Sequence, residues 1–170
     1  IAYMLTMRAS GRNRVQDYAE KFGVPFFAGK KPWEQKADIV MPCAMQNDVD
    51  LAAAKTILAN GTKYYIEVAN MPTTAEALEL LRNAEGVTVA PSKAVNAGGV
   101  LVSGLEMSQN SERLSWTAEE VDENLHRIMC GIHDTSAAEA EKYGFGYDLV
   151  AGANLAAFQK IADAMMAQGI

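Results

Sequence analysis

Short apolar runs alternate with amphipathic stretches over the first 110 residues of the chain. Three runs, at 38–43, 63–68 and 87–90, have the length and composition of buried strands. Each is followed by a stretch in which apolar positions repeat with helical spacing. Because parallel strands need crossover connections, this alternation predicts an α/β fold, a parallel sheet with flanking helices on both faces.

Polar residues and glycines mark the expected ends of the helices. A helical pattern over 10–22 stops at Gly23, and Asp48 or Asp50 is placed to cap the helix that follows the first strand. In a capping box, a Ser or Thr hydroxyl and a Glu carboxyl three residues later each bind a free backbone amide. Two such boxes are expected, at Thr73 with Glu76 and at Thr117 with Glu120.

The rhythm changes after Asn110, where two amphipathic helices follow without a strand between them. The second of them carries an apolar stripe from Leu155 to Met165, and a polar loop over 141–148 separates the two. We therefore expect a sheet domain over 1–110 and a C-terminal helical segment over 111–170 that packs on it.

The composition is that of an ordinary globular domain, with 49% hydrophobic and 21% charged residues. The net charge is −6 and the basic residues are scattered, so we expect no nucleic-acid partner. No apolar run approaches the roughly 18 residues that cross a bilayer, so no membrane attachment is expected. Cys43 and Cys130 are far apart and predict buried free thiols in a reducing cytoplasm. His126 and His133 lie seven apart, which does not match a helical metal pair, so no metal site is predicted.

A carboxamide follows each of the three predicted strands. Gln46 or Asn47 follows the first, Asn70 the second and Asn96 the third. Ligands of open parallel sheets bind beyond the carboxyl ends of the strands, and amides offer both donors and acceptors to ribose hydroxyls and to a nicotinamide carboxamide. The simpler alternative is that each Asn caps the next helix or turn.

The predicted helix over 95–107 is unusually rich in glycine. Gly98, Gly99 and Gly104 disfavour a helix interior, so they predict a close approach of the backbone to a neighbouring helix or to a ligand. Ser103 then places a hydroxyl on this tightly packed helix, or it merely bonds the preceding helical turn. A GxGxxG loop, which brings a backbone to a dinucleotide pyrophosphate, does not occur in the 170 residues.

Several ordered segments resemble the hexameric glutamate dehydrogenases, most closely their NADP-dependent type. The resemblance covers essentially the whole chain, and its clearest segments are 42–47 (PCAMQN), 69–74 (ANMPTT), 90–100 (APSKAVNAGGV) and 102–110 (VSGLEMSQN). It implies a partial NAD(P)-binding, Rossmann-like domain over 1–110, incomplete on its N-terminal side. It also implies oxidative deamination of L-glutamate to 2-oxoglutarate and ammonia, with hydride transfer to NADP or NAD, in a cytoplasmic homohexamer.

The same resemblance assigns roles to individual residues. Ala44, Gln46 and Asn70 are expected beside the nicotinamide and its ribose, and Asn96 beside both nicotinamide and substrate. Val100 and Ser103 are expected to line the substrate pocket, where the Ser103 hydroxyl meets the side-chain carboxylate of glutamate. The family's catalytic Lys and Asp and its Gly-rich loop have no counterpart here, so the chain is expected to begin near the second strand of the cofactor domain and to be inactive alone.

The chain also departs from the family's usual residues. Met45 stands where the family usually has Thr, and Val68 and Ser92 stand where it usually has Gly. Arg8, Arg12 and Arg14 lie near the place in the sequence where the adenosine 2′-phosphate is recognised, or they are solvated at a helix start. Two other interpretations remain open, a leucine- or phenylalanine-type dehydrogenase and a nucleotide-binding module without catalysis.

Overall fold

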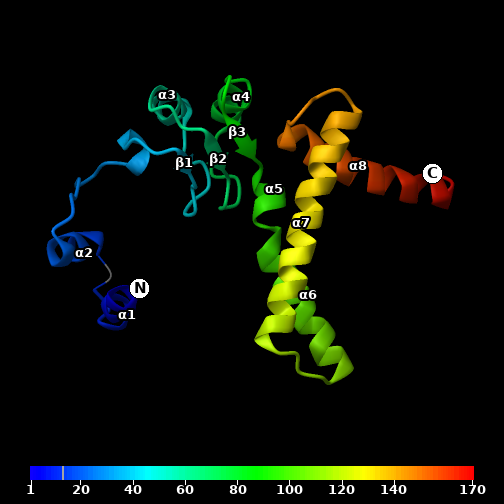
Figure 1. Cartoon of the computed structure of the whole chain (residues 1–170), viewed down its shortest axis with the longest axis horizontal. Coiled ribbons are helices and arrows are strands. Elements are labelled where there is room, and N and C mark those ends of the chain that lie inside the picture. Colours follow the sequence, from blue (N-terminus) through cyan, green and yellow to red (C-terminus); the bar gives the residue numbers. More distant parts are fainter. Residues whose placement is uncertain (13) are drawn as a thin grey trace. The chain divides into compact units, whose positions relative to one another are not determined.

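A computed structural model describes residues 1–12 and 14–170, which form two compact units, Ile1–Pro32 and Trp33–Ile170 (Figure 1). The predicted division at residue 110 stays a prediction, and helix α6 (Ala97–Glu112) runs across that position.

The first unit contains two short helices, α1 (Ala2–Ala9) and α2 (Val15–Phe22). The predicted stop at Gly23 is confirmed, because this residue has the left-handed φ of 63° that ends helices. Of the helical pattern over 10–22, residue 13 lies outside the described residues, and α2 starts at Val15 rather than Ser10 because Arg14 is extended. The Tyr3 and Phe22 rings pack edge to face with centroids 5.5 Å apart, which packs α1 on α2.

The second unit contains the predicted parallel sheet. Its strands are β1 (Ile39–Val40), β2 (Tyr64–Ile66) and β3 (Thr88–Ala90), in the order β1-β2-β3. All neighbours are parallel, with Val40 opposite Tyr65 and Tyr65 opposite Val89. The predicted sheet is therefore confirmed, although each strand is shorter than its apolar run because the ends of the runs form loops.

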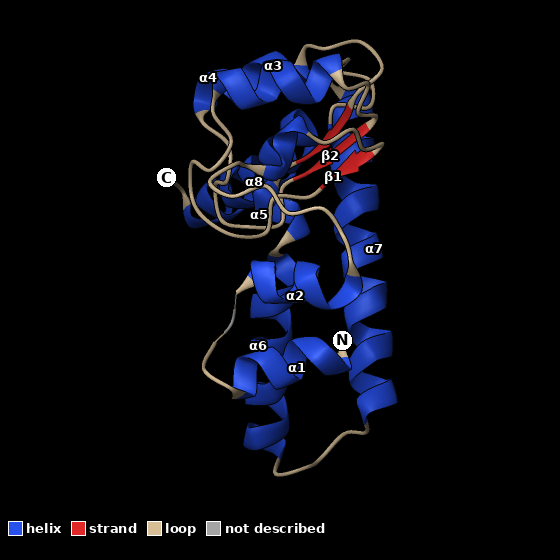
Figure 2. Cartoon of the chain, turned by 90° about the vertical axis from the view of Figure 1, so that its left-hand side faces the viewer, coloured by secondary structure: helices blue, strands red, loops and turns tan. Residues whose placement is uncertain are grey.

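Helices α3 (Leu51–Ala59) and α4 (Ala75–Arg82) connect these strands and lie side by side (Figures 1 and 2). Of the two predicted caps for α3, Asp50 is the one that forms, because its carboxyl accepts the Ala53 amide at 2.8 Å. A single 3₁₀ turn, Pro32–Glu34, lies where the two units join along the chain.

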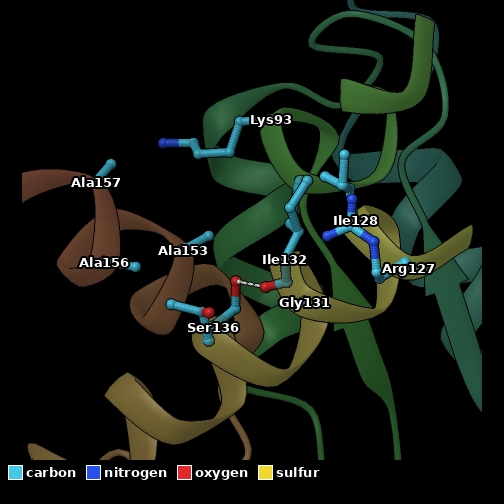
Figure 3. A pocket seen from close by; sticks show the side chains of 11 residues that line it. Lys93, Arg127, Ile128, Gly131, Ile132, Ser136, Ala153, Ala156 and Ala157 are labelled. Carbon is cyan, nitrogen blue, oxygen red and sulfur yellow. Dashed lines mark hydrogen bonds between the residues drawn. The ribbon is translucent and has the colours of Figure 1, made fainter. Parts of the chain in front are cut away.

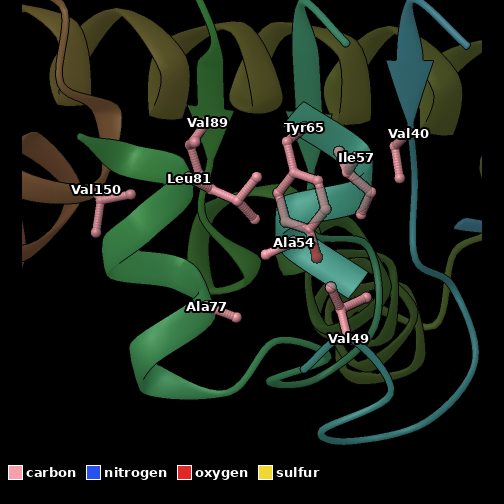
Figure 4. Packing of buried hydrophobic residues seen from close by; sticks show 9 residues of the cluster. All are labelled: Val40, Val49, Ala54, Ile57, Tyr65, Ala77, Leu81, Val89 and Val150. Atoms are coloured by element: carbon pink, nitrogen blue, oxygen red, sulfur yellow. The ribbon is translucent and has the colours of Figure 1, made fainter. Parts of the chain in front are cut away.

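The core lies between the sheet and these two helices (Figure 4). At its centre is the fully buried Tyr65, which lies between Ile57 of α3 and Leu81 of α4. The Tyr65 hydroxyl is 2.7 Å from the Thr73 hydroxyl, and burial raises the pKa of Tyr65 above its ordinary value.

The predicted capping box at Thr73 and Glu76 is wrong. Thr73 uses its hydroxyl for Tyr65, so α4 begins one residue later with Thr74 as its N-cap. The Thr74 hydroxyl is buried, makes no capping bond and finds no hydrogen-bond partner among the described residues. A buried tyrosine in the neighbouring strand thus outcompetes the local cap.

Four helices follow the sheet: α5 (Ser92–Val95), α6, α7 (Ala118–Lys142) and α8 (Leu149–Gln168). The second predicted capping box is confirmed, since Glu120 N–H binds the Thr117 hydroxyl at 3.2 Å and Thr117 N–H binds the Glu120 carboxyl at 2.7 Å. The single helix predicted over 95–107 is instead α5 and α6, separated at Asn96.

Helix α8 starts six residues before its predicted apolar stripe. Asp148 caps it by accepting the Val150 and Ala151 amides at 3.0 Å each, and also pairs with Arg82 of α4 at 2.6 Å. The buried residues Leu149–Ala153 anchor this end of the helix, with Val150 joining the sheet's core. The confirmed C-terminal helices are thereby fixed to the α/β layer.

Gly152 permits the closest contact between α7 and α8. A Cβ built on Gly152 would lie 1.7 Å from the Ser136 carbonyl oxygen of α7, a distance that no atom can occupy. The close approach predicted for the glycine-rich α6 is much weaker. A Cβ on Gly98 would meet Leu125 at 3.4 Å, and Gly99 and Gly104 face open space.

Gly152→Ala is expected to lower the free energy of unfolding by about 3 kcal/mol or more, because the added methyl overpacks a backbone contact. Gly131→Ala in α7 is the matched control, since its Cβ would meet nothing within 4 Å. That change is expected to raise stability by up to about 1 kcal/mol through helix propensity. Urea unfolding followed by circular dichroism measures both, and equal effects would contradict the role of Gly152.

Candidate functional site

Backbone hydrogen bonds join the loops after β1 and β2. Asn47 N–H donates to the Met71 carbonyl at 2.9 Å, and Val49 N–H donates to the Pro72 carbonyl at 2.9 Å. In the other direction, Ala69 N–H donates to the Pro42 carbonyl at 2.9 Å. Because these bonds continue the parallel pairing past the strands, the two loops lie together at the carboxyl edge of the sheet.

Two of the three predicted carboxamides meet at this edge. The Asn96 side-chain Nδ2 donates to Asn70 Oδ1 at 2.5 Å, which joins the loop after β2 to the junction between α5 and α6. Neither side chain caps a helix through a hydrogen bond in the way the simpler alternative required. The pair still leaves the Asn70 amide nitrogen and the Asn96 carbonyl oxygen for other partners.

Ala44 and Gln46 lie on the exposed part of the loop after β1. Across the described residues, the Gln46 side chain makes no hydrogen bond, so its amide is fully available. The structure joins this loop to Asn70 through the Asn47–Met71 backbone bond and not through a side-chain contact. The cofactor roles predicted for Ala44 and Gln46 stay predictions.

Val100 follows Asn96 by four residues and Ser103 follows Val100 by three, so all three residues lie on one face of α6. This face is open, with the Val100 side chain 74% exposed and Ser103 exposed. The Ser103 hydroxyl donates to the Gly99 carbonyl at 3.3 Å, as in the simpler interpretation. Its oxygen still carries lone pairs, and the long bond is easily exchanged for a charged acceptor.

Sequence reasoning missed Glu67, whose residue is only 3% exposed at the end of β2. Its carboxyl Oε2 accepts the Ser92 N–H at 3.1 Å, at the start of α5. The signal was present in the sequence, because an acidic residue interrupts the apolar run from Tyr64 to Val68. A carboxyl group at this depth needs a hydrogen-bond partner, and Ser92 supplies it.

Two non-glycine residues of the strand-end loops have left-handed backbones, Asn47 with φ 55° and Met71 with φ 48°. Asn tolerates this conformation, whereas a residue such as Met pays a steric cost. Val68, which replaces the family's usual Gly, is not among the described residues with positive φ. Met45 is 64% exposed at the same edge.

A separate hollow of about 540 Å³ lies among α5, α7 and α8 (Figure 3). Its walls are mostly small side chains of α7 and α8, and Lys93 at its rim hydrogen-bonds Asn154. None of the predicted site residues lines it. The residues predicted for the site therefore lie outside this hollow, whose lining is mostly apolar.

The cysteines and histidines do not join the site. The predicted burial of the two thiols is wrong, since Cys43 and Cys130 are free and exposed. Cys43 lies just past the end of β1, and Cys130 lies on an uncovered side of α7, 3.7 Å from the His126 ring. His133 instead contacts the Tyr147 hydroxyl at 2.6 Å. In the described part of the chain, no group of three potential metal ligands gathers.

Within residues 1–12 and 14–170, no helix is both long enough and apolar enough to cross a bilayer.

Comparisons with known proteins give one consistent result. The profile of the glutamate/leucine/phenylalanine/valine dehydrogenases matches residues 1–169. The chain is 75% identical to an NAD-specific glutamate dehydrogenase of Clostridium symbiosum and 51% identical to an NADP-specific one of Escherichia coli (strain K12). All of the chain aligns in both cases, and it spans 38% of each relative's length. A solved glutamate dehydrogenase superimposes on 99% of the chain, and on 38% of its own, with a TM-score of 0.95 and 75% identity.

Met71→Gly is expected to raise the free energy of unfolding by about 1 kcal/mol, because Gly adopts the left-handed backbone without the steric cost. Met45→Gly is the matched control, since Met45 is similarly exposed and is not among the described residues with positive φ. That change is expected to cost about 0.4–1 kcal/mol through the entropy of the unfolded chain. A thermal unfolding midpoint that falls in Met71→Gly would count against strain at this loop.

Proposed function

The chain belongs to the glutamate/leucine/phenylalanine/valine dehydrogenase family, and we propose that it forms the nicotinamide- and glutamate-binding wall of a glutamate dehydrogenase. In the proposed reaction, L-glutamate, water and the oxidised cofactor give 2-oxoglutarate, ammonium, the reduced cofactor and a proton. The observation that carries the proposal is the Asn70–Asn96 pair, which lies at the start of the α6 face that bears Val100 and Ser103.

The residues of this edge fit a nicotinamide cofactor by their chemistry. The bound nicotinamide would accept a hydride from the Cα of glutamate. The free amide nitrogen of Asn70 and the free carbonyl oxygen of Asn96 would bind its carboxamide and ribose hydroxyls. Gln46 and the backbone of Ala44 would border the same ring.

The open face of α6 would hold the substrate. The Ser103 hydroxyl would donate to the side-chain carboxylate of glutamate, and Val100 would pack against its methylene groups. A hydrogen bond to a charged acceptor is stronger than a neutral one, so Ser103 favours an acidic side chain over leucine or phenylalanine. This supports glutamate over the apolar amino acids.

The resemblance implies that the catalytic Lys and Asp of the family have no counterpart in these 170 residues. We assign no catalytic acid or base within the chain, and the sequence contains no GxGxxG loop for the pyrophosphate. We therefore propose that activity needs a longer polypeptide, such as those of the aligned relatives. The homohexamer and the cytoplasmic location that the resemblance implies stay predictions.

For the cofactor, sequence analysis favours NADP and allows NAD, and we propose NAD. In the first unit, Asp17 accepts hydrogen bonds from Arg12 Nε at 2.9 Å and from Arg14 Nη2 at 2.9 Å. The bonds from Arg14 and Arg12 hold the pKa of Asp17 below its ordinary value, so the carboxylate keeps its charge at neutral pH. Arg12 and Arg14, two of the three arginines considered for a 2′-phosphate, are thus already paired with a carboxylate. In addition, the relative with 75% identity is NAD-specific.

Ser103→Ala in the full-length enzyme is expected to lower kcat/KM for glutamate by about 10- to 100-fold, the value of a hydrogen bond to a charged group. Ser108→Ala is the matched control, because Ser108, five residues further along α6, donates to Gly104 just as Ser103 donates to Gly99. Steady-state assays with glutamate and leucine measure both effects. A wild-type enzyme that prefers leucine would contradict the proposed substrate.

Asp17→Asn in the full-length enzyme is expected to lower the KM for NADP relative to that for NAD by about two- to fivefold, because an exposed ion pair is worth little more. The change releases Arg12 and Arg14 for a 2′-phosphate. Glu20→Gln removes an equal charge from the same helix and is expected to change the ratio much less, because Glu20 accepts a hydrogen bond from Gln16 and acts on Arg14 only through a weaker charge interaction. A preference for NADP in the wild type would refute the NAD assignment.

A further inference from the structure

Two links join the end of β2 to the segment around α5. The first is the hydrogen bond from Ser92 N–H to the buried Glu67 carboxyl, and the second is the Asn96–Asn70 side-chain bond. The linked pairs are 25 and 26 residues apart in sequence, so both links bind the same two pieces of backbone at nearly the same register.

These links close into a ring. Ser92 gives its N–H to Glu67, and its carbonyl accepts the Asn96 N–H at 2.9 Å. The Asn96 side chain then reaches Asn70, which is three residues from Glu67 along the chain. A displacement of the Glu67 carboxyl therefore displaces Ser92. Asn96 then shifts as well, because its N–H is bound to the Ser92 carbonyl across a single helical turn.

The ring has one deeply buried member. The Glu67 residue is 3% exposed, whereas Asn70 is exposed and Asn96 half-buried. Glu67 N–H also donates to the Ala90 carbonyl at 3.0 Å, so its backbone is held in the sheet. None of the ion pairs found among the described residues includes Glu67. Its side chain is thus an acceptor fixed by the core, placed beneath two amides that are less buried.

We propose that Glu67 is a positioning residue that sets the place of Asn96 through Ser92. This role for Glu67 rests on the proposed function in one respect only, the contact of Asn96 with nicotinamide and substrate. A buried acceptor fixes the start of α5 in one position, and this fixes the junction at which Asn96 turns toward Asn70. Without that acceptor, α5 settles elsewhere and the amide pair separates.

The test uses Glu67→Leu in the full-length enzyme, which removes the acceptor and keeps a buried side chain. We expect kcat/KM for glutamate to fall about 10- to 100-fold, as for a displacement of about 1 Å in a reacting group. Glu67→Gln keeps an oxygen for the Ser92 N–H and is expected to recover most of that loss. A loss in Glu67→Gln as large as in Glu67→Leu would overturn the proposal.

A double-mutant cycle separates positioning from general destabilisation. In an Asn96→Ala background, Glu67→Leu is expected to cost less than about twofold more, because both changes act on one interaction. Additive losses would overturn the proposal. Thr62→Val is the control, since Thr62 is equally buried just before the other end of β2 and donates to the Ala37 carbonyl at 2.9 Å. It is expected to lower stability without changing kcat/KM.

Ser92→Pro approaches the same bond from its donor side if Glu67→Leu does not fold. Proline suits the first position of a helix, and Pro91 already has the extended ψ of 147° that a following proline requires. Ser92→Pro is expected to reproduce the loss in kcat/KM, and full activity in this variant would overturn the proposal.

A crystal structure of Glu67→Leu, or of Ser92→Pro if only that variant folds, gives a readout that does not depend on turnover. The Asn96–Asn70 contact is expected to be broken, and an intact contact would overturn the role of Glu67. A wild-type enzyme without glutamate-dependent reduction of NAD or NADP would instead contradict the proposed function and leave this structural result to decide the role of Glu67.

Discussion

Parallel pairing on both sides of β2 is the constraint on which the rest of the structure depends. With β1 and β3 both parallel to it, the three strands must end at the same edge of the sheet. That rule alone brings the loops after β1 and β2 and the start of α5 together, although they are far apart in the sequence. The backbone bond from Asn47 to Met71 and the amide pair of Asn70 and Asn96 follow from it.

The helices after the sheet depend on a second constraint, the space available between α7 and α8. At Gly152 the two backbones approach so closely that no side chain fits, and the small residues beside it continue the contact. The N-terminal end of α8 is in turn fixed to the α/β layer by the Arg82–Asp148 pair and by Val150 in the core. Because α7 packs on α8, this attachment of α8 also holds α7 in place against the sheet.

The sequence predicted those features that arise from local patterns. Apolar periodicity gave the strands and helices, and the Thr117–Glu120 spacing gave the start of α7. Features decided by tertiary partners were not predictable in this way. Thr73 fits a capping box, yet Tyr65 from the adjacent strand takes its hydroxyl, and Cys130 fits an apolar stripe, yet no other element covers it. At the site, the topology of the sheet was enough to predict that Asn70 and Asn96 lie at the same edge. The role of Glu67 could not be predicted, because it depends on how deeply the residue is buried.

Polar residues in β2 and directly after it explain why a strand so short can position a site. Tyr65 and Glu67 are two residues apart, so they project to the same side of the sheet, and both are buried. Tyr65 binds Thr73 in the loop that follows its own strand, and Glu67 binds Ser92 after the next strand. Apolar side chains would fill this space but would allow the two loops to slide. Because a buried polar group without its partner is costly, each hydrogen bond permits one register only, and the carboxamides above are held in that register.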